Sequence, residues 1–132
     1  MAASVLDSHA LLAFFRGEDA ALQVKDLLLK AAADRPLHMT EVNYAEVKYI
    51  LIKKDGADAW NRAADILTSL PIEFHPADRP LADAAADFKS RHKISLADAF
   101  AAALAKERKT DLVTGDPEFK PLEKEIKINW LK

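Results

Sequence analysis

The sequence predicts an α/β fold in which a parallel sheet is covered by helices on both faces. Short apolar segments alternate along the chain with longer stretches of helical spacing, and the apolar segments lack a strict in–out alternation. Both features are typical of parallel strands buried between two layers of helices. The chain has 132 residues, the usual size of one domain, and it contains no linker, repeat or low-complexity tract. We therefore expect a single domain over residues 1–132.

The first half of the chain contains two expected strands and four expected helices. An apolar strand over residues 2–6 leads directly into Asp7, and residues 37–39 form the second strand. The helical stretches are 10–15, 18–33, 41–54 and 57–69. Gly17, the Asp34–Pro36 segment and the Asp55-Gly56 pair separate these helices, because glycine and proline interrupt helical geometry.

Apolar spacing in two of these helices suggests which residues enter the core. In the 18–33 helix the candidate core residues are Leu22, Leu27 and Leu28. In the 41–54 helix a spacing of three to four residues selects Val42, Ala45, Tyr49 and Ile52.

The second half continues the alternation. A third strand is expected at 72–74, and Asp78 followed by Pro80 marks the start of a helix over 79–91. Ser95 opens a helix over 96–108 that is rich in alanine and leucine. Residues 111–114 form the fourth strand, which ends at the Gly115-Asp116 turn, and a last strand over 126–131 is expected at an edge of the sheet.

Composition excludes several classes of function. The net charge of −2 excludes a strongly basic nucleic-acid coat, and the absence of cysteine excludes disulfide scaffolds, thiol nucleophiles and cysteine-ligated metals. The 3 glycines are too far apart to form a G-x-G-x-x-G or Walker A loop. No apolar run approaches the roughly 20 residues of a membrane span, and the N-terminus lacks the features of a secretory signal. We expect a cytoplasmic protein without a membrane partner.

Four acidic residues are candidates for a common site. Asp7 and Asp116 follow strands, Asp98 lies in the first turn of a helix, and Glu46 lies in the second turn of the helix after strand two. Each has an ordinary alternative role: Asp7 as a helix cap, Asp98 in a capping box with Ser95, Asp116 in a turn, and Glu46 on a solvated surface. In a parallel sheet, however, sites gather at the carboxyl ends of the strands.

Several carboxylates at one edge would repel each other, by roughly 4 kcal/mol for two charges about 4 Å apart at an effective dielectric constant near 20. A cation would relieve that repulsion. Oxygen ligands without histidine or cysteine favour Mg²⁺ or Mn²⁺ over zinc. This points to metal-assisted hydrolysis of a phosphodiester.

At these residues the sequence resembles the PIN-domain nucleases, and more closely the VapC-type toxins of type II toxin–antitoxin pairs. Four segments in the same order carry the resemblance: VLDS (5–8), EVNYAEV (41–47), ISLADAF (94–100) and LVTGDPEF (112–119). The resemblance implies a PIN-like three-layer α/β/α fold with a central parallel five-strand sheet. It also implies a Mg²⁺- or Mn²⁺-dependent endoribonuclease.

The resemblance further assigns roles to individual residues. The family's catalytic acids correspond to Asp7, Glu46, Asp98 and Asp116, of which the three aspartates would hold the metal. Glu46 would orient or deprotonate the attacking water, or help to bind a second ion. Three residues would support them: Ser8, Thr114 and Glu118.

Other residues near these motifs have more than one possible role. Glu41 competes with Glu46 for the second acidic position, and Glu118 could equally be a solvated turn residue. The role of Asn43 stays open. His9 stands where relatives more often carry a small or apolar residue; it could contact substrate, although a surface position on the helix is favoured.

Partners follow mostly from the resemblance. It implies an RNA substrate, a cognate antitoxin protein and a homodimer. Basic residues could bind RNA at 48, 53 and 54 and at 91–93, although an ordinary solvated surface is favoured for most of them. Apolar residues that could serve protein partners are Tyr49, Phe14, Phe15 and Trp60, with core burial favoured for Phe14 and Tyr49.

Three alternative functions are open at this point. The first is an RNA-processing or decay nuclease of the same fold without an antitoxin. The second is a phospho-receiver signalling module, which would need an acidic pair after the first strand where this chain has Asp7 alone. The third is a structural role for a degenerate domain, against which the four intact acids argue.

Overall fold

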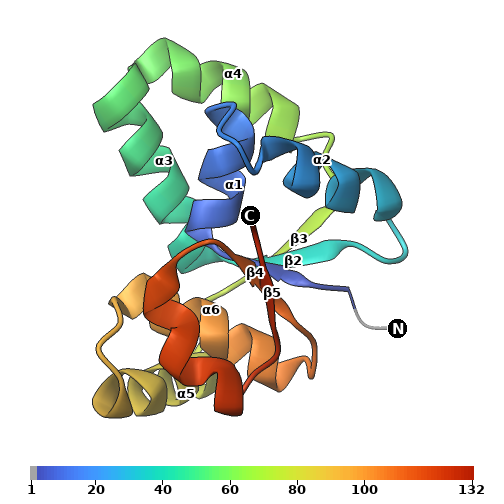
Figure 1. Ribbon diagram of the computed structural model, residues 1–132. Helices are drawn as coiled ribbons and strands as arrows, with labels where there is room; N and C mark the ends of the chain where they lie inside the picture. The colour runs from blue at the N-terminus through green and yellow to red at the C-terminus, as the bar shows by residue number, and fades with distance from the viewer. Residues whose placement is uncertain (1–2) are drawn as a thin grey trace.

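A sheet of five parallel strands forms the centre of the computed structural model, which describes residues 3–132 (Figure 1). The strand order is β3-β2-β1-β4-β5, and every neighbouring pair is parallel. The strands are β1 (Val5–Leu6), β2 (Leu37–Thr40), β3 (Ile72–His75), β4 (Leu112–Thr114) and β5 (Ile128–Trp130). All five expected strands are present, and the last one lies at an edge. The first residue of the expected strand 2–6 lies outside the described residues.

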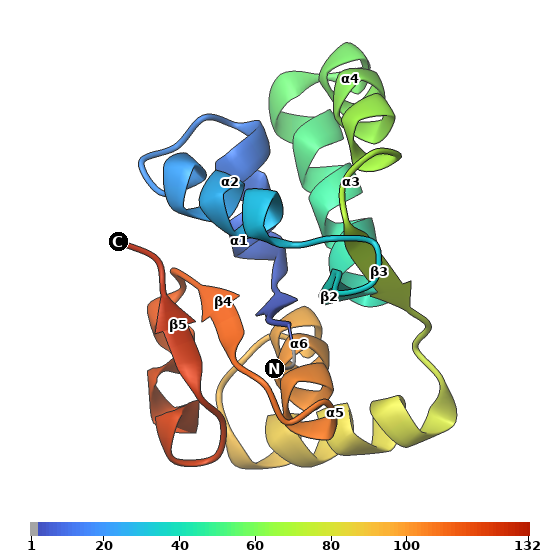
Figure 2. The ribbon, with the colours of Figure 1, turned by 90° about the vertical axis from the view of Figure 1, so that its right-hand side faces the viewer.

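Helices cover both faces of this sheet, which confirms the three-layer α/β/α prediction (Figures 1 and 2). One layer holds α1 (Ser8–Phe15), α2 (Ala21–Lys30), α3 (Glu41–Asp55) and α4 (Ala57–Leu67). The other holds α5 (Arg79–Arg91), α6 (Leu96–Glu107) and a 3₁₀ helix, η1 (Pro117–Lys124). None of the helices within residues 3–132 is both long enough and apolar enough to cross a membrane.

Each face of the sheet has its own hydrophobic core, and alternate residues of the central strands contribute to both. In β1, Val5 packs on the α5–α6 side while Leu6 packs on the α1–α4 side. Leu112 and Val113 divide in the same way in β4. Both faces of these strands are therefore apolar, which explains why the sequence shows no alternation.

The helices differ from the sequence prediction in which residues they bury. Leu22 in α2 is 76% exposed, because α2 buries only the stripe of Val24 and Leu28. In α3 the predicted face is wrong as well: Tyr49 is 52% exposed and Ala45 is exposed. Trp60 in α4, suggested as a partner surface, is buried.

The error in α3 has a physical cause. Apolar residues occur around much of this helix, so spacing alone does not select one face. Its buried stripe is Asn43, Val47 and Leu51, and it begins with a polar residue that a hydrophobic pattern does not count. The η1 helix was not predicted, because Pro117 and Pro121 indicate a break rather than a helix.

The route of the chain creates a switch point between β1 and β4. From β1 the chain moves outward through β2 to β3, then returns through α5 and α6 to β4 on the other side of β1. The β1–β2 connection and the β3–β4 connection therefore run in opposite directions across the sheet. Parallel sheets bind ligands outside the carboxyl ends of the strands at such a point, so Asp7 and Asp116 flank the expected location.

Candidate active site

Asp7 connects the end of β1 to the start of α1 and is almost fully buried. Its Oδ1 accepts a hydrogen bond of 2.8 Å from the backbone N–H of Ala10, and its carboxylate is also hydrogen-bonded by Thr114. Burial raises the pKa of Asp7 from 3.8 to about 7, although both hydrogen bonds lower it. The negative charges of Asp98 and Asp116 contribute to this rise, which places all three acids in one electrostatic environment.

Asp98 occupies the first turn of α6, whose N-terminus faces the same edge of the sheet. Its backbone N–H donates to Ser95 Oγ at 3.0 Å, and its carboxylate accepts hydrogen bonds from Ser95 in return. The predicted capping box is therefore present. Burial raises the pKa of Asp98 to about 6, and the charges of Asp116 and Glu46 add to this effect. Asp98 thus caps a helix and belongs to the acidic cluster.

Asp116 and Thr114 follow the same pattern at the end of β4. Asp116 caps η1, with Oδ1 accepting from Glu118 N–H at 2.9 Å. The Thr114 hydroxyl accepts from Asp116 N–H at 3.0 Å and is hydrogen-bonded to Asp7. One buried hydroxyl group therefore holds two of the acids in register across β1 and β4.

Three carboxylates converge closely enough to bind one ion. Oxygen atoms of Asp98, Asp116 and Glu118 all lie within 4.8 Å of one another. Glu118, which the sequence left open between a supporting role and a solvated turn, is thus placed beside two of the aspartates. Asp7 is not a member of this set, and its electrostatic interaction with Asp98 and Asp116 is what associates it with the cluster.

The two glutamates of α3 are placed differently. Glu46 is half-buried and raises the pKa of Asp98 through its charge, so it lies within electrostatic reach of the cluster. Glu41 in the first turn is exposed, and no interaction connects it to the aspartates among the described contacts. The structure therefore favours Glu46 over Glu41 as the acid that α3 contributes.

Asn43 is the residue whose role the sequence did not reveal. It is fully buried in the first turn of α3, where its Nδ2 donates to Ser8 Oγ at 3.0 Å and to Ala97 O at 3.1 Å. Its Oδ1 accepts from the hydroxyl of Thr40, the residue that ends β2 and caps α3. Asn43 therefore joins three helix N-termini, and its neighbours Ser8 and Ala97 each adjoin one of the acids. Ser8 supports the site through this amide.

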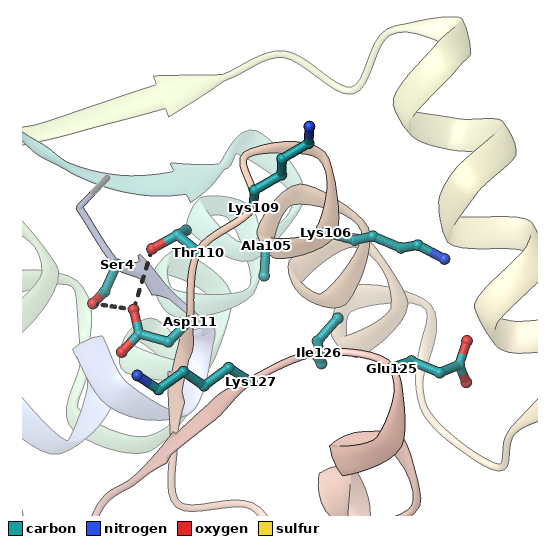
Figure 3. A pocket seen from close by; sticks show the side chains of 9 residues that line it. All are labelled: Ser4, Ala105, Lys106, Lys109, Thr110, Asp111, Glu125, Ile126 and Lys127. Carbon is teal, nitrogen blue, oxygen red and sulfur yellow. Dashed lines mark hydrogen bonds between the residues drawn. The ribbon is translucent and has the colours of Figure 1, made fainter. Parts of the chain in front are cut away.

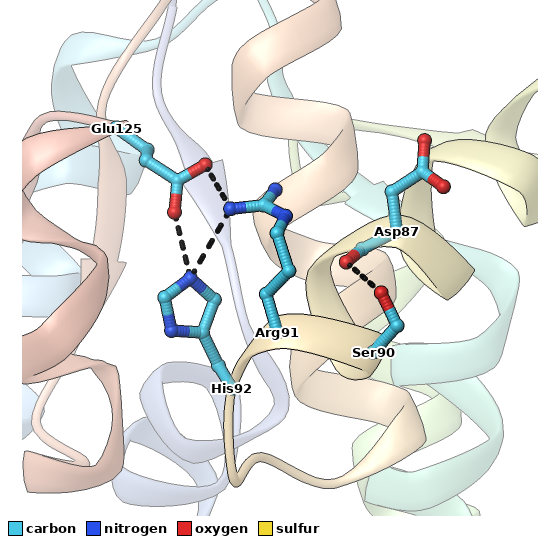
Figure 4. Close-up of polar contacts among 5 residues, drawn as sticks. All are labelled: Asp87, Ser90, Arg91, His92 and Glu125. Carbon is cyan, nitrogen blue, oxygen red and sulfur yellow. Dashed lines mark hydrogen bonds and ion pairs between the residues drawn. The ribbon is translucent and has the colours of Figure 1, made fainter.

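Several cations suggested as RNA ligands already have partners. Arg91 donates to Glu125 at 2.7 Å, and His92 Nε2 lies 2.6 Å from the same carboxylate (Figure 4). These hydrogen bonds hold the pKa of Glu125 below its ordinary value. Lys48 lies over the ring of Trp60, 5.6 Å from its centroid.

A cavity of about 650 Å³ lies away from the acids. Asp111 and Lys127, which immediately precede β4 and β5, line it together with the end of α6. It is therefore at the amino ends of the strands, opposite the acidic cluster. Its three lysines, Lys106, Lys109 and Lys127, point in different directions (Figure 3). This cavity and the clustered acids thus do not coincide.

The family can now be identified from sequence. A family model of the PIN domain matches residues 4–125. The chain belongs to the PIN-domain family. All four resemblance segments fall within the matched residues. A comparison with curated protein sequences found no match.

Solved structures share the fold of this PIN domain. VapBC2 from Rickettsia felis, bound to a DNA fragment from its promoter, is 18% identical with a TM-score of 0.74, and the match covers 98% of each chain. The sarcin–ricin-loop-cleaving toxin VapC20 from Mycobacterium tuberculosis is 18% identical with a TM-score of 0.73, covering 89% of this chain and 92% of that one. DNA-bound VapBC from Salmonella typhimurium is 16% identical with a TM-score of 0.73, covering 98% of each.

The topology of this PIN domain also decides against one alternative. Phospho-receiver modules have the flavodoxin-like strand order 2-1-3-4-5. The order observed here is 3-2-1-4-5, and the segment after β3 leads to Asp78, which caps α5 through a 3.0 Å bond from Leu81 N–H. Asp78 is therefore a structural cap rather than a phosphate acceptor.

Proposed function

We propose that this protein is a divalent-metal-dependent endoribonuclease and the toxin of a toxin–antitoxin pair. The observation that carries this proposal is the convergence of acids from four parts of the chain at the carboxyl ends of β1 and β4. Asp98, Asp116 and Glu118 have ligand atoms within 4.8 Å of one another, and the charges of Asp7 and Glu46 act on this group. Membership of the PIN-domain family is consistent with this chemistry.

The chemistry of the donor set fits a hard divalent cation. Every candidate ligand atom is a carboxylate oxygen, the type that Mg²⁺ and Mn²⁺ prefer. Within residues 3–132, no lysine or arginine forms an ion pair with Asp7, Asp98 or Asp116. The cluster therefore lacks a cation of its own. Burial and the neighbouring carboxylates raise the pKa of Asp7 and of Asp98, and a bound ion would lower both.

The residues divide into those that hold the ion and those that act on water. Asp98 and Asp116 would bind the ion directly, with Asp7 and Glu118 binding it directly or through water. A divalent ion held by these residues would lower the pKa of bound water and offset charge on the scissile phosphate. Glu46 orients the attacking water or accepts its proton. Thr114 and Asn43 keep the acids in place by the hydrogen bonds described above.

Cleavage of RNA by paired variants tests the assignment. We expect Asp98→Asn and Asp7→Asn to lower cleavage by at least about 100-fold in the presence of Mg²⁺ or Mn²⁺, because each removes a charged oxygen from the cluster. Glu46→Gln should also lower it, whereas Glu41→Gln, on the same helix but exposed, should retain wild-type activity. Addition of a chelator should abolish wild-type cleavage. Undiminished activity of both aspartate variants would refute the site.

The antitoxin partner is the second part of the proposal. Structures with this fold include a toxin–antitoxin complex from Klebsiella pneumoniae, with a TM-score of 0.69 at 18% identity over 88% of this chain and 89% of that one. Near the acids, Leu96 at the start of α6 is exposed, and so are Tyr49 and Ile52 of α3. We propose that an apolar antitoxin segment covers residues of this kind in a cytoplasmic complex of two toxin copies.

Growth and co-purification separate the toxin from a plain processing nuclease. Expression of the wild-type chain alone should arrest growth, and Asp98→Asn should not. Co-expression of the product of a small adjacent reading frame should restore growth and co-purify with the chain. If cleavage depends on the acids but expression is harmless, the protein is a nuclease of this family without an antitoxin. Sedimentation analysis checks whether two copies associate.

A further inference from the structure

A second group of potential metal ligands lies on the sheet itself, among residues that the sequence analysis did not single out. His38 is on β2, and Glu73 and His75 are on the neighbouring edge strand β3. In the parallel register His38 is opposite Glu73, and Thr40 is opposite His75. Leu37 and Met39 pack into the core on the α1–α4 side, so the alternate residues of β2 face the α5–α6 side.

The same alternation applies to β3. Ile72 and Phe74 pack on the α1–α4 side, so Glu73 and His75 face the same layer as His38. His38 is buried, the side chain of His75 is 16% exposed, and that of Glu73 is 54% exposed. The group is therefore buried at His38 and open to solvent at Glu73. An ion could enter it from water through the open end.

The ligand atoms are close enough to share one ion. His38 Nδ1 lies 2.9 Å from His75 Nε2, and His75 Nε2 lies 3.2 Å from Glu73 Oε2. One atom from each of the three lies within 4.8 Å of the others. Ligands of a tetrahedral zinc ion, with bonds of about 2.0–2.1 Å, are separated by about 3.3 Å. Two of the three spacings already approach that value.

Hydrogen bonding can satisfy only one of the two short contacts in this arrangement. Both short contacts use the same nitrogen, His75 Nε2. If that nitrogen carries a proton, one N–H must serve the lone pair of His38 and the carboxylate of Glu73 together. If it carries none, its lone pair faces the carboxylate without a proton between them. A cation at the point where the three lone pairs meet satisfies all of them.

The charges around the group are compatible with a metal ion. Burial lowers the pKa of His38, and Arg108 at the end of α6 and His75 lower it further, while Glu73 opposes them. A lowered pKa favours the neutral form of imidazole, which is the form that binds metals. Arg108 also repels a cation, and the carboxylate of Glu73 offsets that repulsion.

We infer that His38, Glu73 and His75 form a second metal site, chemically distinct from the acidic cluster, that binds one zinc ion and leaves a fourth position for water. Two imidazoles and one carboxylate are ligands that suit zinc and disfavour Mg²⁺. The bound ion would join β2 to the edge strand β3 and stabilise that side of the sheet. This inference does not rest on the proposed nuclease function.

Zinc titration of the untagged full-length chain tests the inference. The protein is first freed of metal and then titrated with Zn²⁺ against a chromogenic chelator, in excess Mg²⁺ so that the acidic cluster does not compete. We expect one zinc ion per chain with a dissociation constant of about 1 μM or lower. His75→Gln and Glu73→Gln should each weaken binding by at least about tenfold, because each removes one of three protein ligands.

His92→Gln is the matched control, since His92 also pairs with a glutamate but has no second imidazole beside it. It should bind zinc as the wild type does. Glu73 is largely exposed, so Glu73→Gln should fold even if a histidine variant does not. At the same zinc concentration, the melting temperature should rise equally for the wild type and Asp98→Asn, and by clearly less for Glu73→Gln. Absent zinc binding, or equal binding by wild type and Glu73→Gln, would overturn the inference.

Discussion

Replacing Asp7 by asparagine should stabilise the metal-free protein, because the native site holds a buried charge without a cation. A rise in pKa from 3.8 to about 7 corresponds to about 4 kcal/mol at 1.36 kcal/mol per pKa unit. At pH 8 the wild type carries this penalty in full, since Asp7 is ionised in both the folded and the unfolded chain. Asparagine removes the charge but can still accept the Ala10 N–H bond. We expect a net gain of about 2–4 kcal/mol, since weaker neutral hydrogen bonds replace charged ones.

The pH dependence of this gain follows from proton binding. Between about pH 4 and pH 7, Asp7 is protonated in the folded chain and ionised in the unfolded chain, so the folded state binds more protons. The free energy of unfolding of the wild type therefore falls as the pH rises through this window. The difference between Asp7→Asn and the wild type should grow by about 2–3 kcal/mol from pH 5 to pH 8.

Urea denaturation at several pH values, with a chelator present and tryptophan fluorescence as the signal, measures this difference. Asp78→Asn is the matched control: Asp78 caps α5 in the same geometry but lies outside the acidic cluster, so its replacement should change stability by less than about 0.5 kcal/mol. Saturating Mn²⁺ should stabilise the wild type more than Asp7→Asn. The reasoning is refuted if Asp7→Asn is less stable than the wild type at pH 8, or if the difference does not depend on pH.

Three further predictions concern the residues around the site. Asn43→Ala should lower the free energy of unfolding by about 1–3 kcal/mol in urea denaturation, because it leaves buried partners unpaired; a change below 0.5 kcal/mol would contradict this role. Gly115→Ala would place a Cβ 2.7 Å from Cε1 of His9, but the exposed His9 ring can turn away, so the change should cost less than about 1 kcal/mol, and a double-mutant cycle with His9→Ala should show that this cost disappears; a larger cost that survives His9→Ala would contradict this. Glu125→Gln should lower the free energy of unfolding by about 1 kcal/mol or less at neutral pH, because its partner Arg91 is exposed. This loss should vanish at acidic pH, where native Glu125 is protonated. A loss that does not change with pH would argue against the ion pair.

Much of the sheet and of the acidic cluster could be predicted from local sequence. An acid that directly follows an apolar strand, such as Asp7 after Leu6, is predicted to lie at the carboxyl edge of the sheet, because parallel strands end at a common edge. Asp98 is similar, since the Ser95 capping box fixes where its helix begins. In these cases the position of the side chain follows from the local element that carries it.

The remainder depended on contacts between distant residues. From local sequence, Asn43 is an ordinary polar residue in a helix. Its burial is explained by hydrogen bonds to Ser8 and Ala97, which are distant in the sequence. His38 and His75 are 37 residues apart, and their contact depends on the register of β2 with β3, which no local pattern specifies. Sequence reasoning therefore failed where a polar side chain is buried by a tertiary contact.

The acids that gather at the sheet edge are also the residues that begin helices. Asp7 is bonded to the first turn of α1, Asp98 to Ser95 ahead of α6, and Asp116 to the first turn of η1. Folding has already fixed the rotamer of each of these side chains, so the binding of an ion would cost little additional conformational entropy. An asparagine in place of any of these aspartates keeps the anchoring bond while removing the charge. Variants of this kind should therefore remain well folded, and if the proposed function holds they would still occupy the antitoxin as decoys.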